Sequence, residues 1–159
     1  MTGVQTCALP ISVDLGSGGG DYNVSTGVGG GAIRLIVTGT LTNNGIISAN
    51  GASATGSGDG GAGGSVYVTT STLAGSGIFT ANGGADTNNY GNGGGGGRVA
   101  IYYAGPTSFT GLSTSVAAGG TPSGSVGTVA FFDASVPNSN VGIYQNYVRQ
   151  RTAMSCTTR

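Results

Sequence analysis

The carboxylates of five aspartates are the side chains of this sequence best suited to acid–base chemistry, namely Asp14, Asp21, Asp59, Asp86 and Asp133. Cleavage of a polysaccharide needs two paired carboxylates, or one carboxylate beside a basic residue. Only Asp59 and Asp86 lie in comparable glycine-rich segments, and the chain has no Glu, His or Lys to accompany them. We therefore expect solvated loop acids, no catalytic residue, and a protein that is not an enzyme.

Metal and cofactor sites are not indicated either. The segment from Gly58 to Gly64 is similar to glycine–aspartate repeats that bind Ca²⁺ between turns, but those need an aspartate about every nine residues. No Lys follows any glycine run, so the phosphate-loop pattern is absent. Cys7 and Cys156 stand near opposite ends without metal or redox spacing. We expect no metal ion and no cofactor.

Charge and hydropathy exclude two further classes of function. The five aspartates are balanced by five arginines, so the net charge is zero and no basic face for nucleic acid is expected. No run of 18 apolar residues predicts a transmembrane segment. The N-terminus also lacks the basic and then apolar pattern of a signal peptide.

An internal repeat positions everything else. The twelve residues from Thr40 to Gly51 match those from Thr72 to Gly83 at an offset of 32, with seven identities. A glycine-led apolar segment precedes each copy and recurs twice more at 30 to 33 residues. These segments alternate apolar and other residues, which predicts strands near 32–38, 65–70, 98–103 and 128–132.

Units of this length cannot bury a core alone and gain one by stacking. The sequence therefore predicts an all-β fold, a parallel β-helix or solenoid of about four 30–33-residue glycine-rich repeats. Stacking would place Thr40 over Thr72 and Asn50 over Asn82 as side-chain ladders. A short segment around Leu41 or Leu73 follows each long strand. The third unit, from Ala104 to Ala118, departs from this pattern and contains Pro106.

Glycine makes up 35 of the 159 residues and dominates the remaining part of each unit. Asn50-Gly51 and Asn82-Gly83 predict turns, because both residue types tolerate positive φ. The glycine runs that follow either stay mobile or pack backbone against backbone. They are connecting loops in one interpretation and packed polyproline-II helices in the other.

Two outer surfaces carry candidate binding residues. One surface has threonines at alternating positions, namely Thr38, Thr40, Thr42, Thr70 and Thr72. On a flat face such threonines could order water and bind ice. Their simpler interpretation is β-branched residues on a strand. Tyr67, Tyr102 and Tyr103 could present rings to a glycan, although Tyr103 has the parity of the core.

The ends of the chain differ from its middle. Residues 2–11 resemble the translation of a short-read sequencing adapter, so we exclude residues 1–11 from the fold and expect the chain to be a fragment of a longer parent. Residues 12–135 form the glycine-rich β-repeat region. Residues 136–159 form a C-terminal tail or cap of different composition.

The motifs Gly-Gly-Gly-Gly-Arg-Val-Ala-Ile-Tyr-Tyr at 94–103 and Ser-Ala-Asn-Gly at 48–51 resemble the glycine-rich repeat regions of large bacterial adhesin-like proteins. The resemblance implies a secreted or cell-surface location, with glycans, other surface proteins and the rest of the parent chain as partners. We expect a non-catalytic structural or adhesive segment. The alternatives are the flank of a β-helical polysaccharide-degrading enzyme and an ice-binding surface.

Overall fold

The structure of the chain is a computed structural model that describes residues 13–20, 25–87, 90–113, 116–135 and 141–143. These residues form strands and extended segments and contain no helix. Seven strands occur in the order β1 (Ala32–Thr42), β2 (Ile46–Ser48), β3 (Ser65–Ala74), β4 (Ile78–Thr80), β5 (Arg98–Tyr103), β6 (Thr128–Asp133) and β7 (Val141–Ile143).

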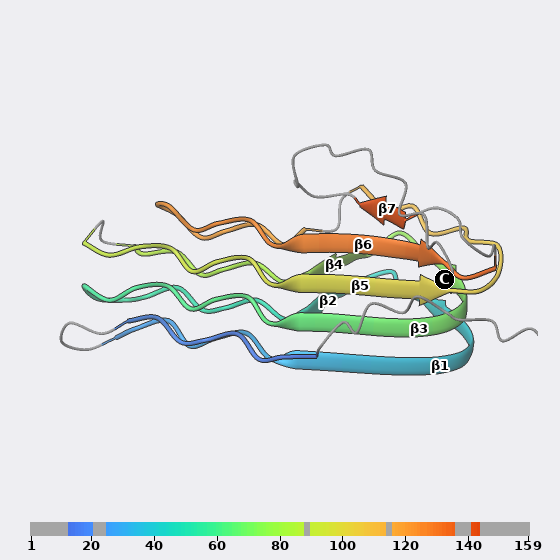
Figure 1. The fold of residues 1–159 in the computed structure, drawn as a ribbon, viewed down its shortest axis with the longest axis horizontal. Coiled ribbons are helices and arrows are strands. Elements are labelled where there is room, and N and C mark those ends of the chain that lie inside the picture. The colour runs from blue at the N-terminus through green and yellow to red at the C-terminus, as the bar shows by residue number, and fades with distance from the viewer. Residues whose placement is uncertain (1–12, 21–24, 88–89, 114–115, 136–140, 144–159) are drawn as a thin grey trace, which may run out of the picture.

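The strands stack into a parallel β-solenoid, which confirms the predicted fold class. The larger sheet has the order β1-β3-β5-β6-β7, in which β1, β3, β5 and β6 run parallel (Figure 1). Each step along these parallel strands is one turn of the solenoid, about three turns in all. β7 closes the sheet by pairing antiparallel with β6. The second sheet pairs β2 with β4 in parallel.

The core is built from inward rows of side chains in register across the large sheet. One row joins Ile33, Val66, Val99 and Val129, and the next joins Leu35, Val68, Ile101 and Phe131. In β3, β5 and β6 these side chains are at most 2% exposed. This is the face that the alternation of apolar residues predicts.

The strands β1 and β3 continue past the expected ends. A β-bulge falls between Val37 and Thr40, after which Leu41 pairs with Leu73. The prediction of a short separate segment around these leucines is therefore wrong, since both leucines belong to the long strands. The Thr40–Thr72 pair of the predicted ladder is present.

The third unit keeps its coil although it lacks the motif of the first two. Val116 of this unit makes a parallel bridge to Thr80 of β4. Phe109 is buried in the core, with its ring 5.5 Å from that of Phe79. Phe109 also lies 6.0 Å from the ring of Phe131, so this unit contributes to the same core.

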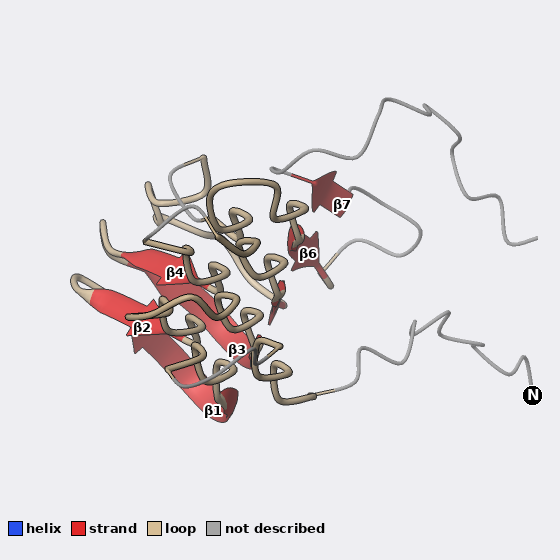
Figure 2. Cartoon of the chain, turned by 90° about the vertical axis from the view of Figure 1, so that its left-hand side faces the viewer, coloured by secondary structure: helices blue, strands red, loops and turns tan. Residues whose placement is uncertain are grey.

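The glycine-rich half of each coil consists of extended segments that run out from the second sheet and back to the first (Figure 2). The predicted turns at Asn50-Gly51 and Asn82-Gly83 are wrong, because neither glycine has positive φ and the chain continues straight. Backbone hydrogen bonds recur at every third residue, as when Gly61 and Gly64 donate to Ala52 and Ala49. Three residues per turn is the period of polyproline II, the second of our two interpretations.

Glycine is required here because the backbones touch. A Cβ on Gly61 would lie 2.1 Å from the carbonyl oxygen of Val28, and one on Gly94 would lie 2.1 Å from that of Gly61. Real Cβ atoms do not approach so closely, as in collagen, where only glycine fits at the axis. The segments are thus packed layers of backbone.

Within the described part of the chain, no helix has the length and apolar character needed to cross a membrane.

Candidate binding surface

The two acids singled out from the sequence accept hydrogen bonds from backbone N–H groups at the glycine-rich tips. A carboxylate oxygen of Asp59 accepts the N–H of Asn92 at 2.6 Å, one coil further on. A carboxylate oxygen of Asp86 accepts the N–H of Gly91 at 2.7 Å. Asp86 is only 4% exposed, so the expectation of a solvated loop acid is wrong for this residue. Its carboxylate joins the end of one glycine-rich segment to the start of the next.

The other charged side chains are scattered. Asp14 and Arg98 lie on the outer face of the large sheet, and Asp133 ends β6. Hydrogen bonds from the hydroxyl and backbone N–H of Ser135 lower the pKa of Asp133. Among the described residues, no three His, Cys, Asp or Glu side chains gather where a metal ion could bind. Both cysteines, one aspartate and three arginines lie outside the described residues, namely Cys7, Cys156, Asp21, Arg149, Arg151 and Arg159.

The calcium-like segment is part of a packed layer. Gly60 and Gly63 donate their N–H groups to Asn92 and Gly95 of the next coil. Gly61 and Gly64 donate to the opposite layer. The first two amides therefore join neighbouring coils, and the other two join the two layers of one coil.

The threonine array is short. Thr40 pairs with Thr72, but Thr70 is buried at 3% exposure and its hydroxyl donates to the carbonyl oxygens of Gly39 and Thr72. In the third coil, Tyr103 occupies the place of Thr70. Among the described residues, Thr40 and Thr72 are thus the only two of the five candidate threonines that pair with each other.

The three tyrosines point to the two faces of the sheet that their odd or even positions in the strands predict. Tyr103 packs against the core, whereas Tyr67 and Tyr102 point outward from β3 and β5. One coil further on, Phe132 extends this line, since it pairs with Tyr102 in the sheet. Phe132 was not singled out from the sequence, although its position one repeat after Tyr102 was a signal that could have found it.

These residues form a continuous line that we call the outer aromatic row, consisting of Arg34, Tyr67, Tyr102 and Phe132. The rings of Tyr102 and Phe132 are stacked, with centroids 4.4 Å apart and an angle of 7°. The ring of Tyr67 lies 5.6 Å from that of Tyr102, and the Arg34 guanidinium lies 5.9 Å from the Tyr67 centroid. Burial, and secondly the neighbouring Tyr67, raise the pKa of Tyr102.

The row is accessible on the outer face of the large sheet. Its three rings are half-buried, so that part of each remains in contact with solvent, and Arg34 is exposed. Ile36 adds an apolar side chain that is 63% exposed, in register with Tyr102 through Thr69. The surface combines aromatic area, hydroxyl groups and one cation.

Comparison of the chain with models of protein families, with curated proteins and with solved structures gave no match.

Proposed function

We propose that the chain is a non-catalytic structural and adhesive segment of an extracellular or cell-surface repeat protein, and that its outer aromatic row contacts glycans. The observation that carries this proposal is the row itself. Tyr67, Tyr102 and Phe132 join three successive coils into one amphipathic ridge, with Arg34 at its end.

The chemistry of the row suits a sugar. A pyranose ring has an apolar C–H face that packs on aromatic carbon, and hydroxyl groups that hydrogen-bond at its rim. Tyr67 and Tyr102 supply both kinds of contact, and Arg34 supplies further donors. A ridge spanning several coils fits an extended polymer better than a single small molecule.

The structural part of the proposal is supported by how the coils are joined. The backbone N–H of Asn82 donates to the side-chain oxygen of Asn50, and the side-chain oxygen of Asn82 accepts the N–H of Ala118. Such a ladder stiffens a solenoid along its length. Asp59 and Asp86 also bond across and within turns, which is the role of a structural acid.

The incomplete burial of apolar side chains in the first coil supports the proposal that the chain belongs to a longer solenoid. Ile33 and Leu35 are half-buried, whereas their partners Val66 and Val68 in the next coil are at most 1% exposed. An additional coil against β1 would cover these side chains in the same way. A stack of many coils would repeat weak surface contacts and gain avidity.

A glycan array with the full chain tests the adhesive role. We expect the chain to retain one class of polysaccharide and Tyr67→Ala to bind it about tenfold more weakly, because an aromatic contact and a hydroxyl are lost. Tyr90→Ala is the matched control, since Tyr90 is 83% exposed and lies at the glycine-rich tip outside the row.

Three outcomes would contradict the proposal. The adhesive role fails if no glycan is retained, or if Tyr67→Ala and Tyr90→Ala bind equally well. The structural role fails if far-ultraviolet circular dichroism of the full chain shows no cooperative thermal unfolding, because a stacked solenoid unfolds as a unit.

A further inference from the structure

The segment 16–20 lies as an additional polyproline-II strand on the outer side of the returning glycine segments. It fills the groove between residues 27–30 and 59–62. Gly16 and Gly19 donate to the carbonyl oxygens of Gly30 and Gly27 at 2.8 and 2.9 Å. On the other wall, Ala62 and Asp59 donate to the carbonyl oxygens of Ser17 and Gly20 at 2.9 and 3.1 Å.

The returning segments repeat, so grooves of the same kind follow, although the last returning segment is shorter because residues 121–123 form a turn. The hydrogen bonds between them set the correspondence, because Gly30 donates to Ala62, Gly63 to Gly95, and Gly96 to Ser125. The third groove therefore lies between 91–97 and 124–127. Its carbonyl oxygens on Gly93 and Gly96, and its N–H on Ser125, have no hydrogen-bond partner among the described residues.

The second groove, between 58–64 and 91–97, is obstructed. A Cβ on Gly29 would lie 1.9 Å from the carbonyl oxygen of Gly16 in the filled groove. Ala62 occupies the position equivalent to Gly29, so its methyl group stands where a docked carbonyl would lie. In the third groove this position is Gly95, whose added Cβ would meet only the oxygen of Ser125, at 3.9 Å.

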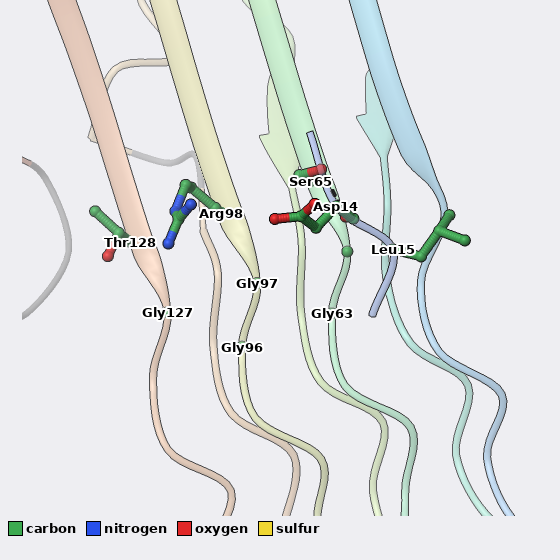
Figure 3. A pocket seen from close by; sticks show the side chains of 10 residues that line it. Asp14, Leu15, Gly63, Ser65, Gly96, Gly97, Arg98, Gly127 and Thr128 are labelled. Carbon is green, nitrogen blue, oxygen red and sulfur yellow. Dashed lines mark hydrogen bonds between the residues drawn. The ribbon is translucent and has the colours of Figure 1, made fainter. Parts of the chain in front are cut away.

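A surface depression coincides with the ends of these grooves. It is lined by Gly96, Gly97, Arg98, Gly127 and Thr128 on one side, and by Asp14 and Ser65 on the other (Figure 3). The Ser65 hydroxyl donates to the Asp14 carbonyl oxygen at 2.7 Å, where the docked segment begins. Thr128 stands at the same register two coils later and keeps the hydroxyl.

We propose that the third groove binds an extended polyproline-II chain with glycine at every third residue, supplied by another protein. The filled groove defines this requirement, because a Cβ on Gly16 or Gly19 would lie 2.1 or 2.0 Å from the carbonyl oxygens of Ala62 or Asp59. The groove recognises backbone: Gly93 and Gly96 accept, while Ser125 and the Thr128 hydroxyl donate. This inference is independent of the glycan-binding role.

Amide NMR of the full chain, titrated with a blocked peptide of residues 14–20, tests the site. We expect the N–H signals of Gly95 and Ser125 to shift saturably. The same peptide with Gly16→Ala and Gly19→Ala should bind about tenfold more weakly or not at all, because its methyl groups prevent the backbone hydrogen bonds.

Two protein variants locate the site. Gly95→Ala should abolish the shifts, because its methyl group reproduces the obstruction by Ala62 while meeting no close atom of the protein. Ala62→Gly should open the second groove and bring new shifts at Gly95 and Gly63. Thr128→Val should weaken binding about threefold through loss of one hydrogen bond.

Four results would each contradict the proposal that the third groove binds the peptide. Shifts confined to Gly30 and Ala62 would mean that the peptide only displaces segment 16–20 from the filled groove. Unchanged binding by Gly95→Ala, or equal binding of the alanine-containing peptide, would also overturn the proposal. The absence of any shift at millimolar peptide would do the same.

Discussion

The backbone N–H of Asn82 donates a hydrogen bond of 2.7 Å to the side-chain oxygen of Asn50, 32 residues earlier in the chain. The side-chain oxygen of Asn82 accepts the N–H of Ala118 at 2.8 Å in the same way. One residue type therefore links three coils at the point where each leaves the second sheet. The predicted stacking of Asn50 and Asn82 is confirmed, but the bond that joins them runs from side chain to backbone.

Removing a member of this ladder should lower the stability of the chain. Asn82→Ala leaves the partly buried N–H of Ala118 without its acceptor, which we expect to reduce the free energy of unfolding by about 1–2 kcal/mol. Asn82→Asp retains an acceptor oxygen and is the control. Urea unfolding followed by circular dichroism measures both, and an unchanged midpoint for Asn82→Ala would show that the ladder is not stabilising.

The sequence predicted the β half of each coil because that half carries side chains. Alternation in Val66 and Val68, repeated in Val99 and Ile101, identifies strands and their inward face. The 32-residue offset identifies which residues pair. Phe132 was overlooked because its own repeat is less regular, yet its register beside Tyr102 follows from the same spacing.

The glycine half was harder to predict, since packing there is specified by the absence of side chains. In the run from Gly93 to Gly97 every residue is glycine, so the three-residue period of hydrogen bonding leaves no pattern in the sequence. The turn preference of Asn50-Gly51 was overridden because the Asn50 side chain bonds to the next coil. The outer segment 16–20 preceded the recognisable repeats and had no equivalent with which to align.

Adjacent glycines in one layer should differ sharply in their tolerance of alanine. A Cβ on Gly30 would lie 2.1 Å from the Ala49 oxygen and 2.5 Å from the Gly64 nitrogen, whereas one on Gly31 meets nothing within 4 Å. We expect Gly30→Ala to lower the free energy of unfolding by about 3 kcal/mol or to prevent folding. Gly31→Ala should change it by less than about 0.5 kcal/mol. Thermal melts of the two variants compare them, and similar melting temperatures would contradict close backbone packing.

The aromatic cluster of the core should dominate the stability of the later coils. Phe79 is fully buried, with its ring 5.5 Å from Phe109 and 6.3 Å from Phe131. We expect Phe79→Ala to reduce the free energy of unfolding by about 3–5 kcal/mol, through lost burial and the cavity left behind. Ile46→Ala, at a side chain that is 69% exposed, is the control. Denaturant unfolding tests this prediction, which fails if both variants lose the same amount.

The outer aromatic row should be visible in the titration of Tyr102. Burial is the larger cause of its raised pKa and Tyr67 the smaller, so Tyr67→Phe should lower the pKa of Tyr102 while leaving it above the ordinary 10.0. Because the folded chain holds this proton more tightly than the unfolded chain, the corresponding stability is fully present below pH 10.0 and is lost as the pH rises through the raised value. Carbon-13 NMR of the tyrosine ring carbons, with Tyr102→Phe for assignment and Tyr90→Phe as control, measures the shift. Titration of Tyr102 at or below its ordinary pKa would show that its ring is not held in the stacked, partly buried arrangement.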